Sequence, residues 1–143
     1  MKKGHLLALA VAVGALVLVA AAGAVVKPSF SLAGASVTDK GKLHCTFTEV
    51  NLPVALTDNL TCSATVRWVL LCSGTPITLK ISVFASKNLL STGAGTIDSS
   101  IDVNHGAKPG AGSCTVTSSQ YEAVKVKDNN SRAQIGIPGT FPF

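Results

Sequence analysis

The sequence has few charged and few aromatic residues. Only 13% of its 143 residues are charged, compared with about 25% in a typical soluble protein. Aromatic residues make up 5%, with one tryptophan and one tyrosine. Serine, threonine, glycine and alanine take the place of the missing charges. Such a weakly charged surface suits an extracellular protein that meets other copies of itself or a harsh medium.

Sequence motifs of catalytic and phosphate-binding sites are also missing. The chain contains no Gly-x-Ser-x-Gly, no His-Glu-x-x-His and no phosphate-binding glycine loop. After residue 26 the only histidines are His44, expected on an exposed strand face, and His105, expected in a loop. The seven acidic residues are spread along the chain and suggest no carboxylate pair. The sequence therefore predicts a protein that is not an enzyme, with no catalytic residue and no cofactor.

No metal site is predicted either. The cysteines do not form a Cys-x-x-Cys pair, and His44 would point to the opposite strand face from Cys45. Asp98, Asp102 and Asn104 have the side chains of a calcium site. Their alternation instead predicts a solvated face of one strand.

Although the chain is basic, its basic residues do not cluster. After residue 26 there are ten basic and seven acidic side chains, a net charge of +3. The basic ones are scattered, with little aromatic interleaving, whereas a phosphate-binding surface gathers them on one face. We expect no nucleic-acid partner.

The chain starts with a long apolar run, Leu6–Val26, in which 21 residues carry no charged or hydrogen-bonding side chain. As an α-helix it would be about 31 Å long, close to the roughly 30 Å of a bilayer core. Because it has no polar face, such a helix belongs in lipid or inside a helix bundle. Lys2 and Lys3 precede it, which indicates that the rest of the chain is exported. We expect a basic leader over residues 1–4 and a helix over residues 5–26.

Three fates are open to this run. It can be a cleaved secretory signal, because small-x-small sites end at Ala24 and at Ala35. It can be a retained membrane anchor, which fits its length better, since signal cores run about 7 to 15 residues. In the third, the helix leaves the membrane and packs among its own copies, where its many small residues allow close approach.

The third fate rests on a resemblance. Lys2-Lys3-Gly4, directly before the apolar run, resembles the prepilin-peptidase site of type IV pilins, particularly archaeal pilins and archaellins. The resemblance implies cleavage between Gly4 and His5, and a helix that forms the core of a surface filament. It also implies a β-rich globular domain after the helix. Leu9 stands where bacterial-type pilins usually carry a glutamate, which argues against the bacterial type.

The rest of the chain shows the two-residue alternation of strands. Residues 27–42 are small, polar and interrupted by Pro28, so we expect a linker with one short strand near Ser36–Asp39. About seven short strands follow, with turn residues between them, and indicate an antiparallel immunoglobulin-like β-sandwich over residues 43–143. The predicted fold class is thus mainly β, an N-terminal apolar α-helix followed by this sandwich. The alternating runs are 43–48, 60–72, 77–83 and 97–103, of which 60–72 is the clearest, and residues 121–127 and 131–137 flank an expected hairpin turn at 128–130.

Four cysteines in an exported domain predict two disulfides. Cys62 and Cys72 lie on one extended run about 33 Å apart, whereas bridged Cα atoms lie within about 7 Å, so these two should not pair. Cys45 and Cys62 flank a single connection and can face each other across adjacent strands. We therefore predict bridges Cys45–Cys62 and Cys72–Cys114.

Two glycosylation sequons begin at Asn59 and Asn129, both at expected turns. The chain ends in a proline-kinked tail with Phe141 and Phe143, for which we expect packing on the domain's own core.

Together these features predict a non-enzymatic extracellular structural protein. The leading hypothesis is a pilin-like subunit that lies in the membrane before assembly and then polymerises with its own copies through the apolar helix. The alternative is a secreted or membrane-anchored immunoglobulin-like binding or adhesion domain with a cleaved signal peptide.

Overall fold

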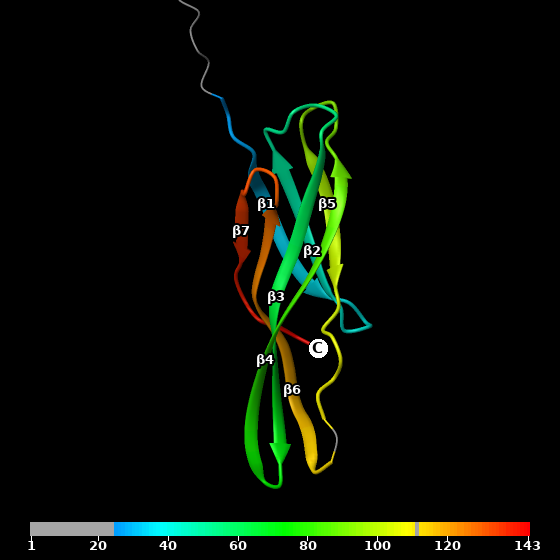
Figure 1. The fold of residues 1–143 in the computed structure, drawn as a ribbon, viewed down its shortest axis with the longest axis vertical. Coiled ribbons are helices and arrows are strands. Elements are labelled where there is room, and N and C mark those ends of the chain that lie inside the picture. Colours follow the sequence, from blue (N-terminus) through cyan, green and yellow to red (C-terminus); the bar gives the residue numbers. More distant parts are fainter. Residues whose placement is uncertain (1–24, 111) are drawn as a thin grey trace, which may run out of the picture.

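A computed structural model describes residues 25–110 and 112–143, which form two facing antiparallel sheets (Figure 1). One sheet has the order β1-β2-β5, and the other has the order β4-β3-β6-β7, with β8 also paired to β6. The chain therefore crosses between the sheets after β2, after β4 and after β5. The strands are β1 (Ser29–Val37), β2 (Leu43–Val50), β3 (Thr57–Cys72), β4 (Thr75–Leu90), β5 (Ile97–Val103), β6 (Cys114–Asp128), β7 (Gln134–Ile137) and β8 (Phe141–Pro142).

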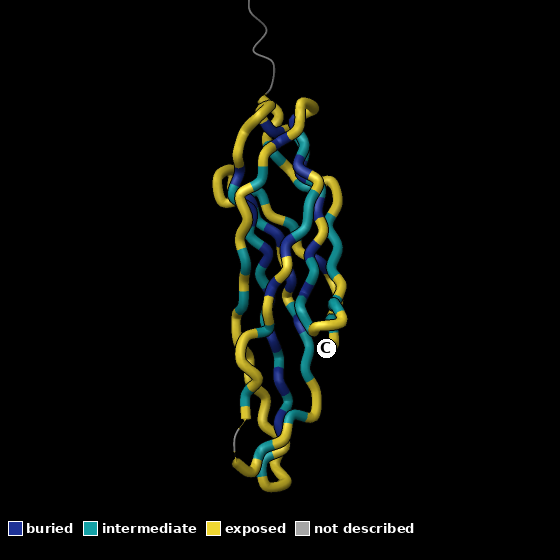
Figure 2. The backbone as a smooth tube through the Cα atoms, turned by 90° about the vertical axis from the view of Figure 1, so that its right-hand side faces the viewer, coloured by how far each residue is buried: buried dark blue, intermediate teal, exposed yellow. Residues whose placement is uncertain are grey.

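The core lies between the two sheets and follows the alternation of the sequence. Along β2, buried residues at every second position begin with Leu43, and along most of β3 the same alternation holds from Asp58 onward. Successive side chains of a strand point to opposite faces, so one face of each sheet carries the apolar residues. Figure 2 shows buried residues along the inner strands and exposed ones on outer strands and turns.

The five-stranded sheet is longer than its partner. β3 and β4 have sixteen residues each and β6 has fifteen, whereas the strands of the other sheet have seven to nine. Their ends extend beyond the sandwich at the bottom of Figure 1. The sandwich thus has two unlike ends: an upper end, where the described chain begins, and this lower extension.

The predicted fold class is wrong in its first element. The described residues are in strands and connections and contain no helix. Most of the predicted helix over residues 5–26 lies outside the described residues, but Val25 and Val26 belong to it and are irregular and exposed. Pro28 disfavours helical backbone at Lys27 directly before it, and strand β1 starts at Ser29, so a helix has no room to continue here. The two facing sheets agree with the predicted β-sandwich.

No helix among residues 25–110 and 112–143 is long and apolar enough to cross a membrane.

The predicted linker over residues 27–42 is also wrong. β1 occupies Ser29–Val37 and pairs with β2 from Ser29 opposite Val50 to Val37 opposite Leu43. The sandwich therefore begins at Ser29 rather than at Leu43. Much of β1 consists of serine, alanine and glycine, whose side chains give a weak hydrophobic alternation. β1 forms nevertheless because its backbone N–H and C=O groups pair with those of β2, and this pairing is not visible in the sequence of β1.

Candidate functional site

Of the predicted cleavage sites, some precede the residues that the structure describes and one lies among them. Gly4, His5 and Ala24 lie outside the described residues. Ala35 lies within β1, half-buried and opposite Cys45 in the ladder. Cleavage after Ala35 would leave only the last two residues of β1 in the sandwich.

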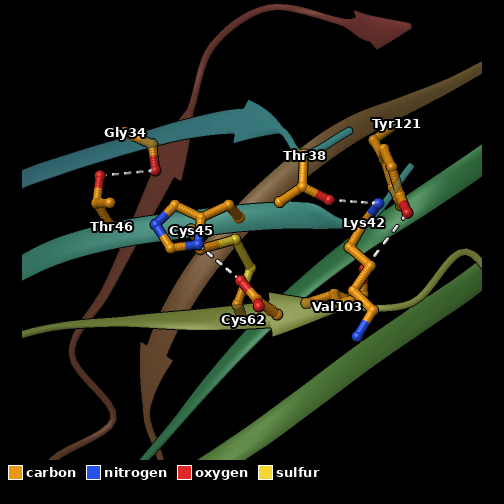
Figure 3. A network of polar contacts seen from close by, with 10 residues as sticks. Gly34, Thr38, Lys42, Cys45, Thr46, Cys62, Val103 and Tyr121 are labelled. Carbon is orange, nitrogen blue, oxygen red and sulfur yellow. Dashed lines mark hydrogen bonds and ion pairs between the residues drawn. A yellow bond between two sulfur atoms is a disulfide. The ribbon is translucent and has the colours of Figure 1, made fainter. Parts of the chain in front are cut away.

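Both predicted disulfides are confirmed. Cys45–Cys62 joins β2 to β3 and so ties the two sheets together (Figure 3). Cys72–Cys114 joins β3 to β6 in the lower extension, where the two residues are opposite one another with Cα atoms 4.1 Å apart. Disulfides form and persist in oxidising surroundings, so the two bridges indicate an extracellular or secreted protein.

The two sequons meet on one patch. The Asn129 side-chain amide donates to Asn59 Oδ1 at 2.5 Å and to the Thr61 hydroxyl at 2.7 Å. The Asn59 amide donates in turn to Asn88 Oδ1 at 2.6 Å. Each amide nitrogen to which a glycan would be attached is therefore hydrogen-bonded to a neighbour. Glycosylation at either residue stays a prediction.

Three acidic side chains converge inside the upper end of the sandwich. Glu49 comes from β2, Asp58 from β3 and Asp128 from β6, and we call them the carboxylate cluster. At most 1% of each residue's surface is exposed. One carboxylate oxygen from each lies within 4.8 Å of the other two. Glu49 belongs to one sheet and the two aspartates to the other, so the cluster spans the sandwich near the end where the described chain begins (Figure 1).

The two aspartates of the cluster have some hydrogen-bond donors, but Glu49 has none. Asp58 Oδ1 accepts from the backbone N–H of Asn59 at 2.9 Å and from the Asn130 side-chain amide. Asp128 Oδ1 accepts from the backbone N–H of Asn130 at 2.7 Å. Both carboxylate oxygens of Glu49, and Oδ2 of Asp128, are buried, and no donor group of another described residue reaches them. Within the described residues the ion pairs are formed elsewhere, so no basic side chain neutralises the cluster.

These surroundings shift the pKa values of the cluster. Burial, reinforced by the negative charges of Asp128 and Asp58, raises the pKa of Glu49 from 4.5 to about 8. Burial also raises the pKa of Asp58. Burial alone would raise the pKa of Asp128 too, but hydrogen bonds from the following turn, including the Asn130 N–H, outweigh it, and the net shift of that pKa is downward. Without a cation, Glu49 is thus largely protonated at neutral pH.

The spread of the acidic residues along the sequence suggested no carboxylate pair, yet the structure brings three of the seven together. A signal was nevertheless present in the alternation. Glu49 is in phase with the inward-facing Leu43, Cys45 and Phe47 of β2. Asp58 begins the buried series of β3, and Asp128 ends that of β6 after Val124 and Val126. An acidic residue on the core side of a strand marks a buried carboxylate, and the sequence contains three.

The side chains considered for a calcium site lie elsewhere. Asp98 and Asp102 are exposed on β5, as the alternation predicts, and Asn104 is exposed just after it. His44 lies on the outer face of β2, where its Nδ1 is 2.6 Å from Asp102 Oδ1. The Thr48 hydroxyl donates to Asp98 at 3.3 Å. These contacts hold β2 and β5 together on their solvent side.

The other end of the core is closed by four rings, which we call the aromatic cluster: Trp68, His105, Tyr121 and Phe143. The Phe143 ring stacks on His105 at a centroid distance of 5.0 Å and meets Trp68 edge-on at 5.2 Å. The Tyr121 hydroxyl donates to the carbonyl oxygens of Gly41 at 2.8 Å and of Val103 at 3.3 Å (Figure 3). The predicted packing of Phe143 on the domain's own core is confirmed.

A further surface feature is the outer strand β4, which among the described strands pairs only with β3. One edge of this sixteen-residue strand therefore has no strand beside it. Most of its side chains are exposed, among them large apolar ones that we call the β4 surface: Ile77, Leu79 and Ile81 on one face of the strand and Phe84 and Leu90 on the other, with 39 to 73% of each exposed. Large exposed apolar surface of this kind is typical of interaction sites.

Comparison with known proteins adds no assignment: no protein-family model matches the chain, and no curated protein matches it.

Proposed function

We propose that the chain is a non-enzymatic extracellular structural protein, a pilin-like subunit that assembles with copies of itself into a surface filament. The observation that carries this proposal is the β4 surface on a domain with few charges. The two disulfides support an extracellular location, and the apolar run before residue 25 supports export.

The β4 surface suits contact between copies. Soluble proteins protect an outer strand with charged side chains, proline or a covering segment, because an open edge pairs readily with another strand. β4 carries Lys80 and Lys87 and has Pro76 near its start, yet five large apolar side chains remain exposed. In a homopolymer each copy carries both the β4 surface and the complementary surface to which the β4 surface of a neighbouring copy binds. Pairing through β4 would bury apolar area that an isolated domain leaves in water.

The first described residues, Val25 and Val26, and most of the β4 surface lie in different parts of the domain. The described chain begins at Val25 at the upper end, whereas β4 runs along the side and into the lower extension (Figure 1). The apolar run, retained after cleavage at Gly4, provides the apolar contacts of the filament interior. The sandwich then faces outward, with β4 available to a neighbouring copy.

One observation favours the alternative of a secreted binding domain. Residues 25–28 precede β1 and belong to no strand, so cleavage after Ala24 would leave all eight strands complete. Cleavage after Ala35 would instead remove most of β1 and expose the edge of β2. The free domain is therefore expected to begin at Val25 rather than at Ser36.

The test is the N-terminal sequence, intact mass and sedimentation of the protein recovered from the outside of the producing cells. A chain that begins at His5 and sediments as a polymer supports the filament subunit. A soluble monomer that begins at Val25 supports the binding domain and contradicts the filament.

A substitution tests the role of the β4 surface in assembly. Phe84, 73% exposed on β4, is replaced by lysine, and the polymer fraction is measured by sedimentation. We expect at least about a tenfold weaker association, equivalent to 1.4 kcal/mol, because a charge must then be buried in each contact. Ser118→Lys, at an exposed position of β6, is the matched control. Equal polymerisation of both variants would exclude β4 as the contact.

A further inference from the structure

We propose that the carboxylate cluster of Glu49, Asp58 and Asp128 is a binding site for one calcium ion that links the two sheets at the upper end of the sandwich. This inference does not depend on polymerisation. It rests on the convergence of three buried carboxylates and on the unpartnered oxygens of Glu49.

The composition of the cluster selects a hard cation. All three side chains offer carboxylate oxygens, with no sulfur or imidazole among them, and such ligands suit Ca²⁺, Mg²⁺ or Mn²⁺. Calcium binds oxygen at about 2.3 to 2.6 Å, so two of its ligands can lie up to about 5 Å apart, whereas the limit for magnesium is about 4 Å. The oxygens of the cluster lie within 4.8 Å of one another. Calcium can span the whole of this range, so we assign the site to calcium and use magnesium as the comparison ion.

Glu49 provides the second observation. Its side chain is fully buried, and neither of its oxygens has a hydrogen-bond donor, although it reaches across from β2 towards the two aspartates. A buried carboxylate without donors or a counter-ion is strongly unfavourable. Asp128 Oδ2, also buried and unpartnered, belongs to the same cluster. A divalent cation among these oxygens would satisfy the unpartnered atoms and neutralise the charge of the carboxylates that bind it.

The chain around the cluster provides a way in for the ion. Asn129 and Asn130 follow Asp128 in the turn before β7 and are exposed. The Asn130 side chain reaches back to Asp58, so this turn lies between the cluster and solvent. An ion can enter by displacement of the Asn130 amide, without opening of the sheets.

The proposal fits the environment that the disulfides indicate. Calcium sites of extracellular modules have dissociation constants of about 0.1 to 1 mM. An ion bound with this affinity would join β2 of one sheet to β3 and β6 of the other, as the Cys45–Cys62 bridge does further along the core. Calcium would then stabilise the folded chain in proportion to its occupancy.

The experiment uses the full chain, purified in mild detergent and freed of divalent ions with a chelator. Calorimetric titration with calcium chloride is expected to show one ion per chain, and the thermal unfolding midpoint, followed by the fluorescence of buried Trp68, is expected to rise with calcium concentration. Magnesium chloride at equal concentration is expected to have a weaker effect. Absence of binding heat and of any midpoint shift at millimolar calcium, or equal effects of both ions, would overturn the proposal.

The variant Glu49→Gln keeps the shape of the side chain and removes its charge. Loss of a group that merely supports a ligand lowers metal affinity by about 10- to 100-fold, so loss of Glu49 itself should cost at least that much. Asp128→Asn serves as a second variant in case Glu49→Gln does not fold. Asp98→Asn, which removes an exposed carboxylate outside the cluster, should bind calcium like the unaltered chain. Equal calcium responses in all variants would place the ion elsewhere and contradict the proposal.

Discussion

The two ends of the sandwich core are closed by opposite kinds of side chain. At the lower end, Trp68 and Tyr121 are buried against other rings, and the Tyr121 hydroxyl donates to two carbonyl groups. At the upper end, Glu49 is equally buried but has no donor. Burial of an aromatic ring gains free energy roughly in proportion to its apolar area. Burial of a carboxylate costs several kcal/mol unless a proton or a cation compensates.

The difference shows that equal burial can have opposite consequences for stability. The aromatic end buries mainly apolar ring atoms, although Trp68 Nε1 and His105 Nδ1 have no hydrogen-bond partner among the described residues, whereas the carboxylate end depends on a proton or a cation from solution. The two ends should therefore respond differently to pH and to substitution.

The largest expected effect is the pH response of the carboxylate end in metal-free protein. Between pH 4.5 and about 8, Glu49 is ionised in the unfolded chain but protonated in the folded one. The folded chain then binds more protons, so the free energy of unfolding falls as pH rises, by on the order of 5 kcal/mol from Glu49. The raised pKa of Asp58 acts in the same direction and the lowered pKa of Asp128 in the opposite one.

This response is measured by urea unfolding across that pH range in the presence of a chelator. In Glu49→Gln the fall in the free energy of unfolding with rising pH should be much smaller, since glutamine does not titrate. A decline of the same size in both proteins would show that Glu49 is not its source.

The aromatic end should instead lose stability on truncation at every pH. Trp68→Ala removes a ring of which 3% is exposed, and such substitutions cost about 3 to 5 kcal/mol. The measurement is urea unfolding followed by circular dichroism. Phe84→Ala, at an exposed position of β4, should change the free energy of unfolding by less than about 0.5 kcal/mol. Similar losses in the free energy of unfolding for both variants would show that the different burial of Trp68 and Phe84 does not set the cost of truncation.

The smallest expected effect concerns the one hydroxyl of the aromatic end. Tyr121→Phe keeps the ring and removes the donor to Gly41 and Val103, at a cost of about 1 to 2 kcal/mol. Thr117→Val is the matched control, because it also removes a hydroxyl that donates to a carbonyl oxygen, of Val69 at 3.1 Å, but at an exposed site. The control should be close to neutral. Equal costs would show that burial does not set the value of the Tyr121 hydrogen bonds.

Most strands could be predicted from the sequence because alternation is a local property. The run over residues 60–72 falls within β3, and Cys62 and Cys72 lie too far apart on it to pair. Strand geometry thus also predicted both disulfides. β1 was missed because its serine, alanine and glycine residues carry little hydrophobic signal, and the predicted helix does not extend over Val25 and Val26.

Which side of a strand faces the core is a local property of the chain, because it follows from a two-residue period along one stretch of sequence. Glu49, Asp58 and Asp128 each lie on the inward face at one end of a buried series, just outside the predicted segments 43–48, 60–72 and 121–127. That these faces belong to opposite sheets and meet at the same end of the sandwich follows from the way the strands pair and pack. That meeting depends on strand order and register between segments up to 79 residues apart, from Glu49 to Asp128. A local pattern cannot predict contacts between segments this far apart in the sequence, and the carboxylate cluster exists only once both sheets have formed.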